Sequence, residues 1–153
     1  PAIGAGCDLS LMCDIRIAAK SAIFAESFVK VGIIPGDGGS GLLSGVVGYS
    51  KAAEMIFTGD SISAEEALSF GLVSKVVEDQ DLMSAATDVA KRIMANPNYA
   101  VRMAKRLLKT AQTVSLNEEL ELASSMQALA SATEDNQEAL NAFLEKRKPV
   151  FKS

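Results

Sequence analysis

Two glycine-rich turns, Gly4–Gly6 and Gly36–Gly39, lie about thirty residues apart near the start of the chain, and each is followed by an apolar run of helix-like composition. A glycine turn that opens a helix leaves backbone N–H groups without partners. Such groups can bind an anion, or an oxyanion that forms during a reaction. Asp8 follows the first turn closely. An acid beside free backbone donors indicates proton transfer next to a polarised carbonyl.

The composition fits one globular domain with a real core. The chain has 153 residues, of which 48% are hydrophobic and 22% charged, and its net charge is −4. This acidic balance argues against a nucleic-acid-binding protein, which usually carries a basic face. Three local basic groups are either solvated helix faces or contacts for a phosphate-bearing ligand. These groups are Lys91–Arg92, the basic residues within 102–109, and Lys146–Lys148.

The residues available for catalysis are limited because the sequence contains no His. This excludes a Ser-His-Asp triad, a Cys-His pair and any His-ligated metal within the chain. Cys7 and Cys13 lack metal-ligand spacing, and their apolar surroundings predict buried free thiols. We therefore expect no metal site, no disulfide and a cytoplasmic location. No apolar window approaches the length of about 18 residues that indicates a transmembrane helix.

Hydrophobic periodicity and glycine or proline breaks predict short strands at the front of the chain and helices behind. The predicted strands are 15–19, 22–25 and 72–77. The predicted helices are 5–13, 39–47, 50–57, 63–70, 82–95, 97–113 and 115–130, and a last helix that ends near residue 146. Ser63 with Glu66, and Ser115 with Glu118, form predicted capping boxes.

The run GAGCDLSLMCDIRIAA, followed by FAESFVKVGIIPGDGG, resembles the signature region of the enoyl-CoA hydratase/isomerase family, also called the crotonase family. The likeness continues through Val47–Val77 and into the tail Phe143–Ser153. It implies an α/β (crotonase/ClpP-like) fold, represented here mostly by its helical C-terminal part with a few short strands. The expected domains are part of the crotonase core over residues 1–80 and a helical oligomerisation region over 81–153. In the family, this tail supports homotrimers that commonly pair into hexamers.

The resemblance also implies a substrate and a mode of catalysis. Family members bind an acyl-CoA thioester and stabilise an enolate in an oxyanion hole of two backbone N–H groups. One of these groups maps to Ala5, whereas the other maps upstream of Pro1. Because the family pattern places roughly the first third to two-fifths of the protein before Pro1, we expect a fragment that is inactive alone. We expect no cofactor other than coenzyme A as part of the substrate, and neither a nucleic-acid nor a membrane partner.

Hydratases of this family use two carboxylates, and the chain matches only one of their positions. Asp8 aligns with the first carboxylate, although it is one methylene shorter than the usual glutamate. Phe28 aligns with the second and cannot transfer a proton. The same alignment places Phe28 and Gly36 in the substrate pocket. Hydration by two carboxylates is therefore in doubt, whereas one carboxylate suffices for double-bond isomerisation because it can remove and return a proton.

Two further acids lie near enough in sequence to compensate for Phe28. Glu26 would share a face with Phe28 in an extended chain, but a structural salt bridge is its alternative role. Asp37 lies in the second glycine turn, and its alternative role is to cap the helix that follows. The alternative for Asp8 is a buried polar residue that is hydrogen-bonded to the backbone. The catalytic candidates are thus Asp8, Asp37 and Glu26.

Two other functions compete with this interpretation. The substitution at Phe28 also fits a non-catalytic, crotonase-like module that only oligomerises. Gly36, Gly38 and Gly41 match the dinucleotide-binding pattern G-x-G-x-x-G, which requires a strand before it and a helix after it. Pro35 and the lack of a second βαβ unit disfavour nucleotide binding.

Overall fold

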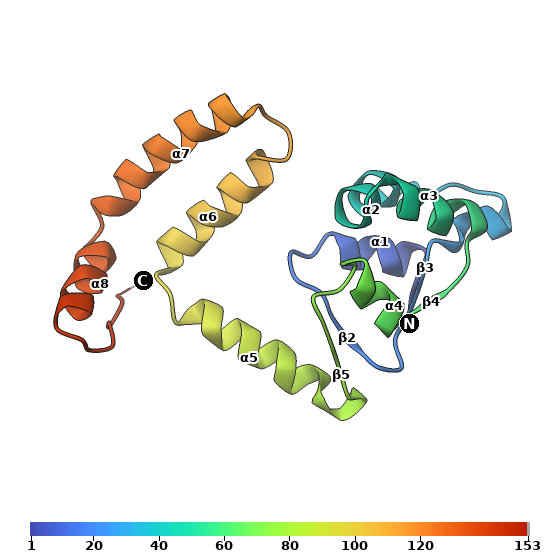
Figure 1. Ribbon diagram of the computed structural model, residues 1–153, viewed down its shortest axis with the longest axis horizontal. Coiled ribbons are helices and arrows are strands. Elements are labelled where there is room, and N and C mark those ends of the chain that lie inside the picture. Colours follow the sequence, from blue (N-terminus) through green and yellow to red (C-terminus); the bar gives the residue numbers. More distant parts are fainter. Residues whose placement is uncertain (153) are drawn as a thin grey trace. The chain divides into compact units, whose positions relative to one another are not determined.

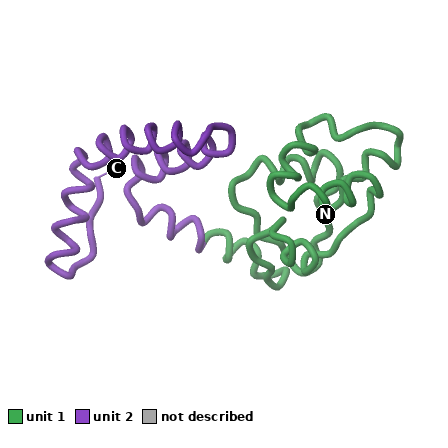
Figure 2. The backbone as a smooth tube through the Cα atoms, turned by 45° about the horizontal axis from the view of Figure 1, so that its top comes forward, with its two compact units in different colours: residues 1–87 green, residues 88–153 purple. Residues whose placement is uncertain are grey.

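The protein divides into two units, residues 1–87 and residues 88–153, which Figure 2 shows in different colours. The structure is a computed structural model and describes residues 1–152. The division between the units falls inside helix α5 (Leu82–Met94). The assignment of a core to residues 1–80 and of an oligomerisation region to residues 81–153 stays a prediction.

The first unit alternates short strands with helices. Its strands are β1 (Ala2–Ile3), β2 (Ile17–Ala19), β3 (Ile23–Ala25), β4 (Ile62–Ser63) and β5 (Lys75–Val77). Its α-helices before α5 are α1 (Ala5–Leu11), α2 (Gly39–Val47), α3 (Tyr49–Thr58) and α4 (Ala64–Ser69), and its 3-10 helices are η1 (Ser27–Val31) and η2 (Asp79–Asp81).

Strand pairing places the start of α1 beside the end of β3. Strands β1 and β3 are parallel, with Ile3 opposite Ala25, and β4 pairs antiparallel with the other side of β3. Strands β2 and β5 form a separate parallel pair. Because α1 follows β1 directly, the parallel register brings its first turn next to Glu26, the residue that follows β3.

The core of the first unit lies between the helices. Helices α2 and α3 lie side by side over α1, and contacts join α1 to α2 and α2 to α3 (Figure 1). Buried apolar side chains fill the space between the elements, and the largest of them are Leu43, Met55, Leu72 and Val73. Asp8 and Glu26 are buried in the same unit. The packed helices therefore enclose two carboxyl groups as well as an apolar core.

The second unit is helical and buries few side chains. It contains α6 (Asn98–Thr110), α7 (Leu116–Ser131) and α8 (Glu134–Leu144), with α6 packed on α7 and α7 on α8. Met126 and Ala142 are buried, whereas several large apolar side chains on these helices are more than half exposed. The latter include Leu108, Leu116, Leu120, Leu129, Phe143 and Leu144. Within residues 1–152, no helix is both long and apolar enough to cross a membrane.

Local sequence signals predict the helices well and the shortest elements poorly. Each predicted helix is present, α2 matches its predicted range of 39–47, and both capping boxes form. The two-residue strands β1 and β4 and the two 3-10 helices are too short to give a periodic signal. The prediction that both cysteines are buried is wrong for Cys13, which is exposed because α1 ends at Leu11.

Candidate active site

The turn before α1 presents a backbone donor without a partner. Gly4 has a φ of 55°, which a glycine adopts without strain, and its N–H donates to the carbonyl of Ala25 at 2.8 Å. The Gly4 carbonyl then accepts hydrogen bonds from the N–H groups of Cys7 and Asp8. Within residues 1–152, the N–H of Ala5 donates to no backbone or side-chain acceptor, and Ala5 is exposed. A ligand oxygen can therefore approach this amide.

Phe28 lies against the same turn. A methyl group built on Gly4 would lie 3.7 Å from Cζ of the Phe28 ring, which is an ordinary van der Waals contact. Phe28 belongs to the 3-10 helix η1, so the expectation that it shares an extended strand face with Glu26 is wrong. Its half-buried ring forms an apolar wall beside the free amide of Ala5.

Asp8 is fully buried and has no hydrogen-bond donor. Its exposed fraction is 0%, and neither of its carboxyl oxygens has a partner among the described residues. The alternative of a structural residue that is hydrogen-bonded to the backbone is therefore wrong. A buried polar group without a partner costs about 1–3 kcal/mol, and more when it is charged. A residue that keeps such a group is a candidate for function rather than for stability.

Gly39, the first residue of α2, leaves room for the Asp8 carboxyl group. A Cβ atom added to Gly39 would lie 1.8 Å from Oδ1 and 2.6 Å from Cγ of Asp8. Such distances do not occur between real atoms, so only glycine fits here unless the carboxyl group moves. The sequence shows a glycine at the start of this helix. It does not show that Gly39 lies against the Asp8 carboxyl group, because that contact depends on the packing of α1 against α2.

Glu26 is the second buried acid and lies close to Asp8. It is 1% exposed, and neither carboxyl oxygen has a hydrogen-bond partner in the described part of the chain. Burial, together with the negative charge of Asp8, raises the pKa of Glu26 to about 7, although the neighbouring Cys7 thiol acts in the opposite direction. The expectation that Glu26 forms a salt bridge is wrong, since no cation contacts this group among residues 1–152.

Cys7 completes the buried group. Its thiol is free and fully buried. Burial is the larger cause, and the neighbouring Glu26 the smaller cause, of a pKa far above the usual range of a thiol. The thiol is therefore protonated and unreactive at neutral pH. Among residues 1–152, no group of three or more acidic, Cys or His side chains has an arrangement that could hold a metal ion.

Asp37 and Gly36 lie in the exposed turn before α2. The helix N-cap is Gly38, with a φ of 97°, and no side chain caps the helix. The alternative role of Asp37 as the N-cap is therefore wrong. The structure brings Asp8 and Glu26 together in the interior, whereas Asp37 is at the surface.

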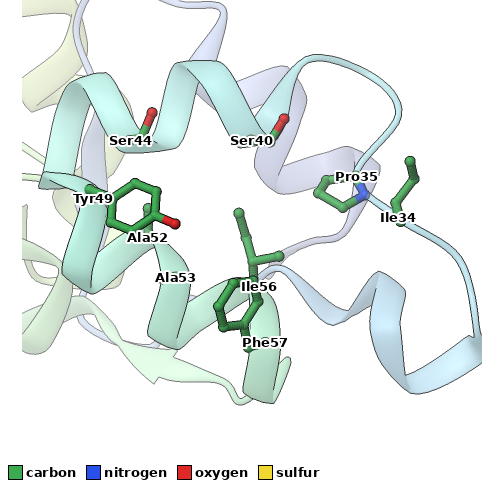
Figure 3. Close-up of a pocket in the computed structure, with 9 residues that line it drawn as sticks. All are labelled: Ile34, Pro35, Ser40, Ser44, Tyr49, Ala52, Ala53, Ile56 and Phe57. Carbon is green, nitrogen blue, oxygen red and sulfur yellow. The ribbon is translucent and has the colours of Figure 1, made fainter.

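A pocket of about 320 Å³ lies between α2, α3 and the segment at Ile34 and Pro35 (Figure 3). Ser40 and Ser44 line it from α2, and five residues line it from α3: Tyr49, Ala52, Ala53, Ile56 and Phe57. Neither buried carboxylate lines this pocket. Sequence patterns gave no sign of it, because it arises only when the two helices pack together.

The dinucleotide-binding interpretation is not supported by the local structure. The pattern of Gly36, Gly38 and Gly41 requires a strand immediately before it. The 3-10 helix η1 and an irregular segment precede it instead. The glycines open α2, whose first residue packs on Asp8.

Comparison with known proteins identifies the family. The family model for enoyl-CoA hydratase/isomerase matches residues 1–153. The chain belongs to the enoyl-CoA hydratase/isomerase family. It is 41% identical over 147 residues to a short-chain-enoyl-CoA hydratase of Clostridium acetobutylicum, covering 96% of this chain and 56% of that protein. It is 38% identical over 150 residues to a 1,2-epoxyphenylacetyl-CoA isomerase of Escherichia coli, covering 98% of this chain and 57% of that protein.

Solved structures of the family have the same fold. A crystal structure of an enoyl-CoA hydratase from Bacillus anthracis matches with a TM-score of 0.96 and 40% identity, covering 99% of this chain and 58% of that chain. The α/β fold is thus crotonase-like, as the sequence predicted. The chain spans a little more than half the length of the relatives that it matches.

Proposed function

We propose that this chain contributes to an enzyme that acts on acyl-CoA thioesters through an enolate. The Ala5 N–H would bind the thioester oxygen, and Asp8 would remove or return a proton at the neighbouring carbon. The observation that carries this proposal is the unpartnered carboxyl group of Asp8, one turn of α1 beyond the free Ala5 amide. Residues three apart on a helix lie on the same face.

The free amide supplies the electrostatic part of this chemistry. A donor at the start of a helix stabilises the negative charge that develops on a thioester oxygen. Removal of one such donor from an oxyanion hole typically costs about 3–4 kcal/mol of transition-state stabilisation. The apolar Phe28 ring lies beside this turn and would shield one side of a bound oxygen from water, which strengthens the interaction of the amide with the oxygen.

Asp8 is enclosed in the structure, so it must turn toward the substrate to transfer a proton. Within residues 1–152, no hydrogen bond holds its carboxyl group, and rotation about its side-chain bonds therefore breaks none. A substrate that offers a polar atom would improve the environment of the carboxylate. The absence of structural partners thus favours a catalytic role over a structural one.

The reaction is hydration or isomerisation of an enoyl-CoA. With Phe28 at the second carboxylate position, Asp8 alone suits a shift of the double bond, and Glu26 is the second acid buried beside it. Of the relatives with similar identity, one is named as a hydratase of short-chain enoyl-CoA and another as an isomerase of 1,2-epoxyphenylacetyl-CoA. A purely oligomerising module would leave the burial of two unpartnered carboxyl groups without a role.

The assembly and the ligand form part of the same proposal. We propose a homotrimer or hexamer, because the exposed leucines on α7 and α8, and Phe143 on α8, are poorly covered within one chain. We also propose that coenzyme A enters as part of the substrate and that no further cofactor is needed. Light scattering after size-exclusion chromatography would measure the oligomer, and a monomer at all concentrations would refute this part.

The test uses the longest protein translated from the gene, here termed the gene product. Crotonyl-CoA hydration and the isomerisation of a 3-enoyl-CoA are followed in wild type, Asp8→Asn and Asp37→Asn. We expect Asp8→Asn to abolish turnover and Asp37→Asn, at the exposed turn, to change it little. Unchanged turnover in Asp8→Asn would overturn the role of Asp8, and failure to bind any CoA thioester would overturn the proposal.

A further inference from the structure

The buried pair Asp8 and Glu26 has four carboxyl oxygens, none of which has a hydrogen-bond partner within residues 1–152. All four atoms are inaccessible to solvent and lack a partner among the described residues. Two ionised carboxylates in this position would repel each other, and the Cys7 thiol beside Glu26 would be the one weak donor near them among the described residues. One added proton removes one charge and supplies a donor to the remaining carboxylate.

Among the described residues, the elements around this pair offer no cation that could take the place of this proton. Strands β1, β3 and β4 and helix α2 carry no charged side chain. Helix α1 contributes only Cys7 and Asp8 as titratable groups. The lysines of η1 and α3 are engaged in the surface salt bridges Lys30–Asp60 and Lys51–Glu54, and the remaining titratable group of α3, Tyr49, is exposed.

We propose that Asp8 and Glu26 share one proton, which Glu26 holds and presents to the Asp8 carboxylate. Glu26 is then a positioning residue that acts through Asp8 and does not touch the substrate. This inference rests on the proposed function, in which Asp8 is the base. It adds that the activity of Asp8 depends on the protonation of a neighbouring acid.

The geometry indicates why Glu26, rather than Asp8, holds the proton. Oδ1 of Asp8 packs against Gly39 at the start of α2, and the N-terminal end of a helix favours an anion. Glu26 directly precedes the 3-10 helix η1, but its side chain does not cap that helix, and burial and Asp8 raise its pKa to about 7 against the lowering effect of the Cys7 thiol. The buried Cys7 thiol beside Glu26 remains protonated and adds no charge.

The shared proton has a consequence for the pH dependence of activity. When the pH rises above about 7, Glu26 loses its proton, and Asp8 loses its donor and gains a like charge beside it. Glu26→Gln keeps an N–H donor but cannot ionise, whereas Glu26→Met has a similar length and no strong donor. We expect Gln to retain activity and to lose the ionisation near neutral pH, and Met to lose activity at least tenfold. A merely structural role for Glu26 would leave the pH profile unchanged in shape.

A direct readout is the ¹³C resonance of each carboxyl group during a pH titration of the gene product. We expect wild type to titrate in two coupled steps, and Asp8→Asn to bring the titration of Glu26 to lower pH. Independent titration of the two groups, or a Glu26 titration that Asp8→Asn does not move, would overturn the shared proton. Asp8→Asn provides this comparison even if the Glu26 variants do not fold.

The same variants separate this inference from the proposed function. If the groups titrate independently but Asp8→Asn abolishes turnover, the shared proton is refuted and the proposed function stands. If they titrate as a coupled pair but Asp8→Asn has normal turnover, the pair stands as a structural feature and its catalytic role is refuted.

Discussion

Replacement of Gly39 by Ala tests whether the position of the Asp8 carboxyl group is set by contact with α2. The new Cβ atom would lie 1.8 Å from Oδ1, 2.6 Å from Cγ and 2.9 Å from Oδ2 of Asp8. Ordinary contacts begin near 3.4 Å, so the carboxyl group or the helix must move by more than 1 Å. Overpacking of a buried site typically costs about 1–3 kcal/mol.

The effect of the substitution on the backbone stabilises the protein and so opposes the clash. Gly41→Ala serves as a matched control for this backbone effect. Alanine stabilises a helix by roughly 0.5–1 kcal/mol relative to glycine. Gly41→Ala, two residues further along α2, meets no atom within 4 Å and should show this gain alone. We therefore expect Gly39→Ala to lower the free energy of unfolding by about 1–2 kcal/mol, and Gly41→Ala to raise it by up to about 1 kcal/mol.

Urea denaturation at constant pH measures both effects, and the double variant isolates the contact. In the Asp8→Ala background the clashing atoms are absent, so Gly39→Ala should behave like Gly41→Ala. The difference between the two backgrounds should be about 1–3 kcal/mol. Displacement of a catalytic group by about 1 Å can cost about 100-fold in rate, so Gly39→Ala should also lose activity. A Gly39→Ala protein with wild-type stability and activity would refute the reasoning.

Three further predictions concern other residues. Because the pKa of Glu26 is raised from 4.5 to about 7, its contribution to stability is fully present below about pH 4.5 and is lost as the pH rises through 7. Across this pH range, the free energy of unfolding should fall by roughly 3 kcal/mol in wild type and by little in Glu26→Gln. The same dependence of this free energy on pH in both proteins would contradict the raised pKa. Ser115→Ala removes the capping box of α7 and should cost about 1 kcal/mol in thermal unfolding, whereas Ser125→Ala, within the same helix, should cost less. Gly4→Ala places an L-residue at a φ of 55° and a ψ of −123°, which should cost about 1–3 kcal/mol and weaken thioester binding at Ala5; wild-type affinity would show that the turn tolerates the change.

The helices could be predicted from the sequence because their signals are local. Ser63 and Ser115 with their partner glutamates mark two helix starts, and glycines mark both ends of α2. These signals act over three or four residues and do not depend on the rest of the chain. The short strands have no such signal, since β1 and β4 exist only through pairing with β3.

The candidate residues could be named from the sequence, but their environments could not. Asp8 and Glu26 are 18 positions apart, and only the parallel pairing of β1 with β3 brings them together. The sequence suggested a structural salt bridge for Glu26 because a buried acid is usually paired with a cation. In an extended strand, Glu26 and Phe28 would lie on the same face. Because the 3-10 helix η1 begins directly after Glu26, the two side chains lie in different environments instead.

The catalytic role of the proton shared by the buried acids depends on Asp8 acting as the base, and Asp8 acts as the base only if a thioester oxygen binds at Ala5. The most direct test is the amide resonance of Ala5 in ¹⁵N-labelled gene product during titration with crotonyl-CoA, with free coenzyme A as the control. We expect the Ala5 resonance to shift with the thioester and not with coenzyme A alone, since only the thioester offers the carbonyl oxygen. An Ala5 resonance that does not move at saturating thioester, or that moves equally with free coenzyme A, would contradict this assignment.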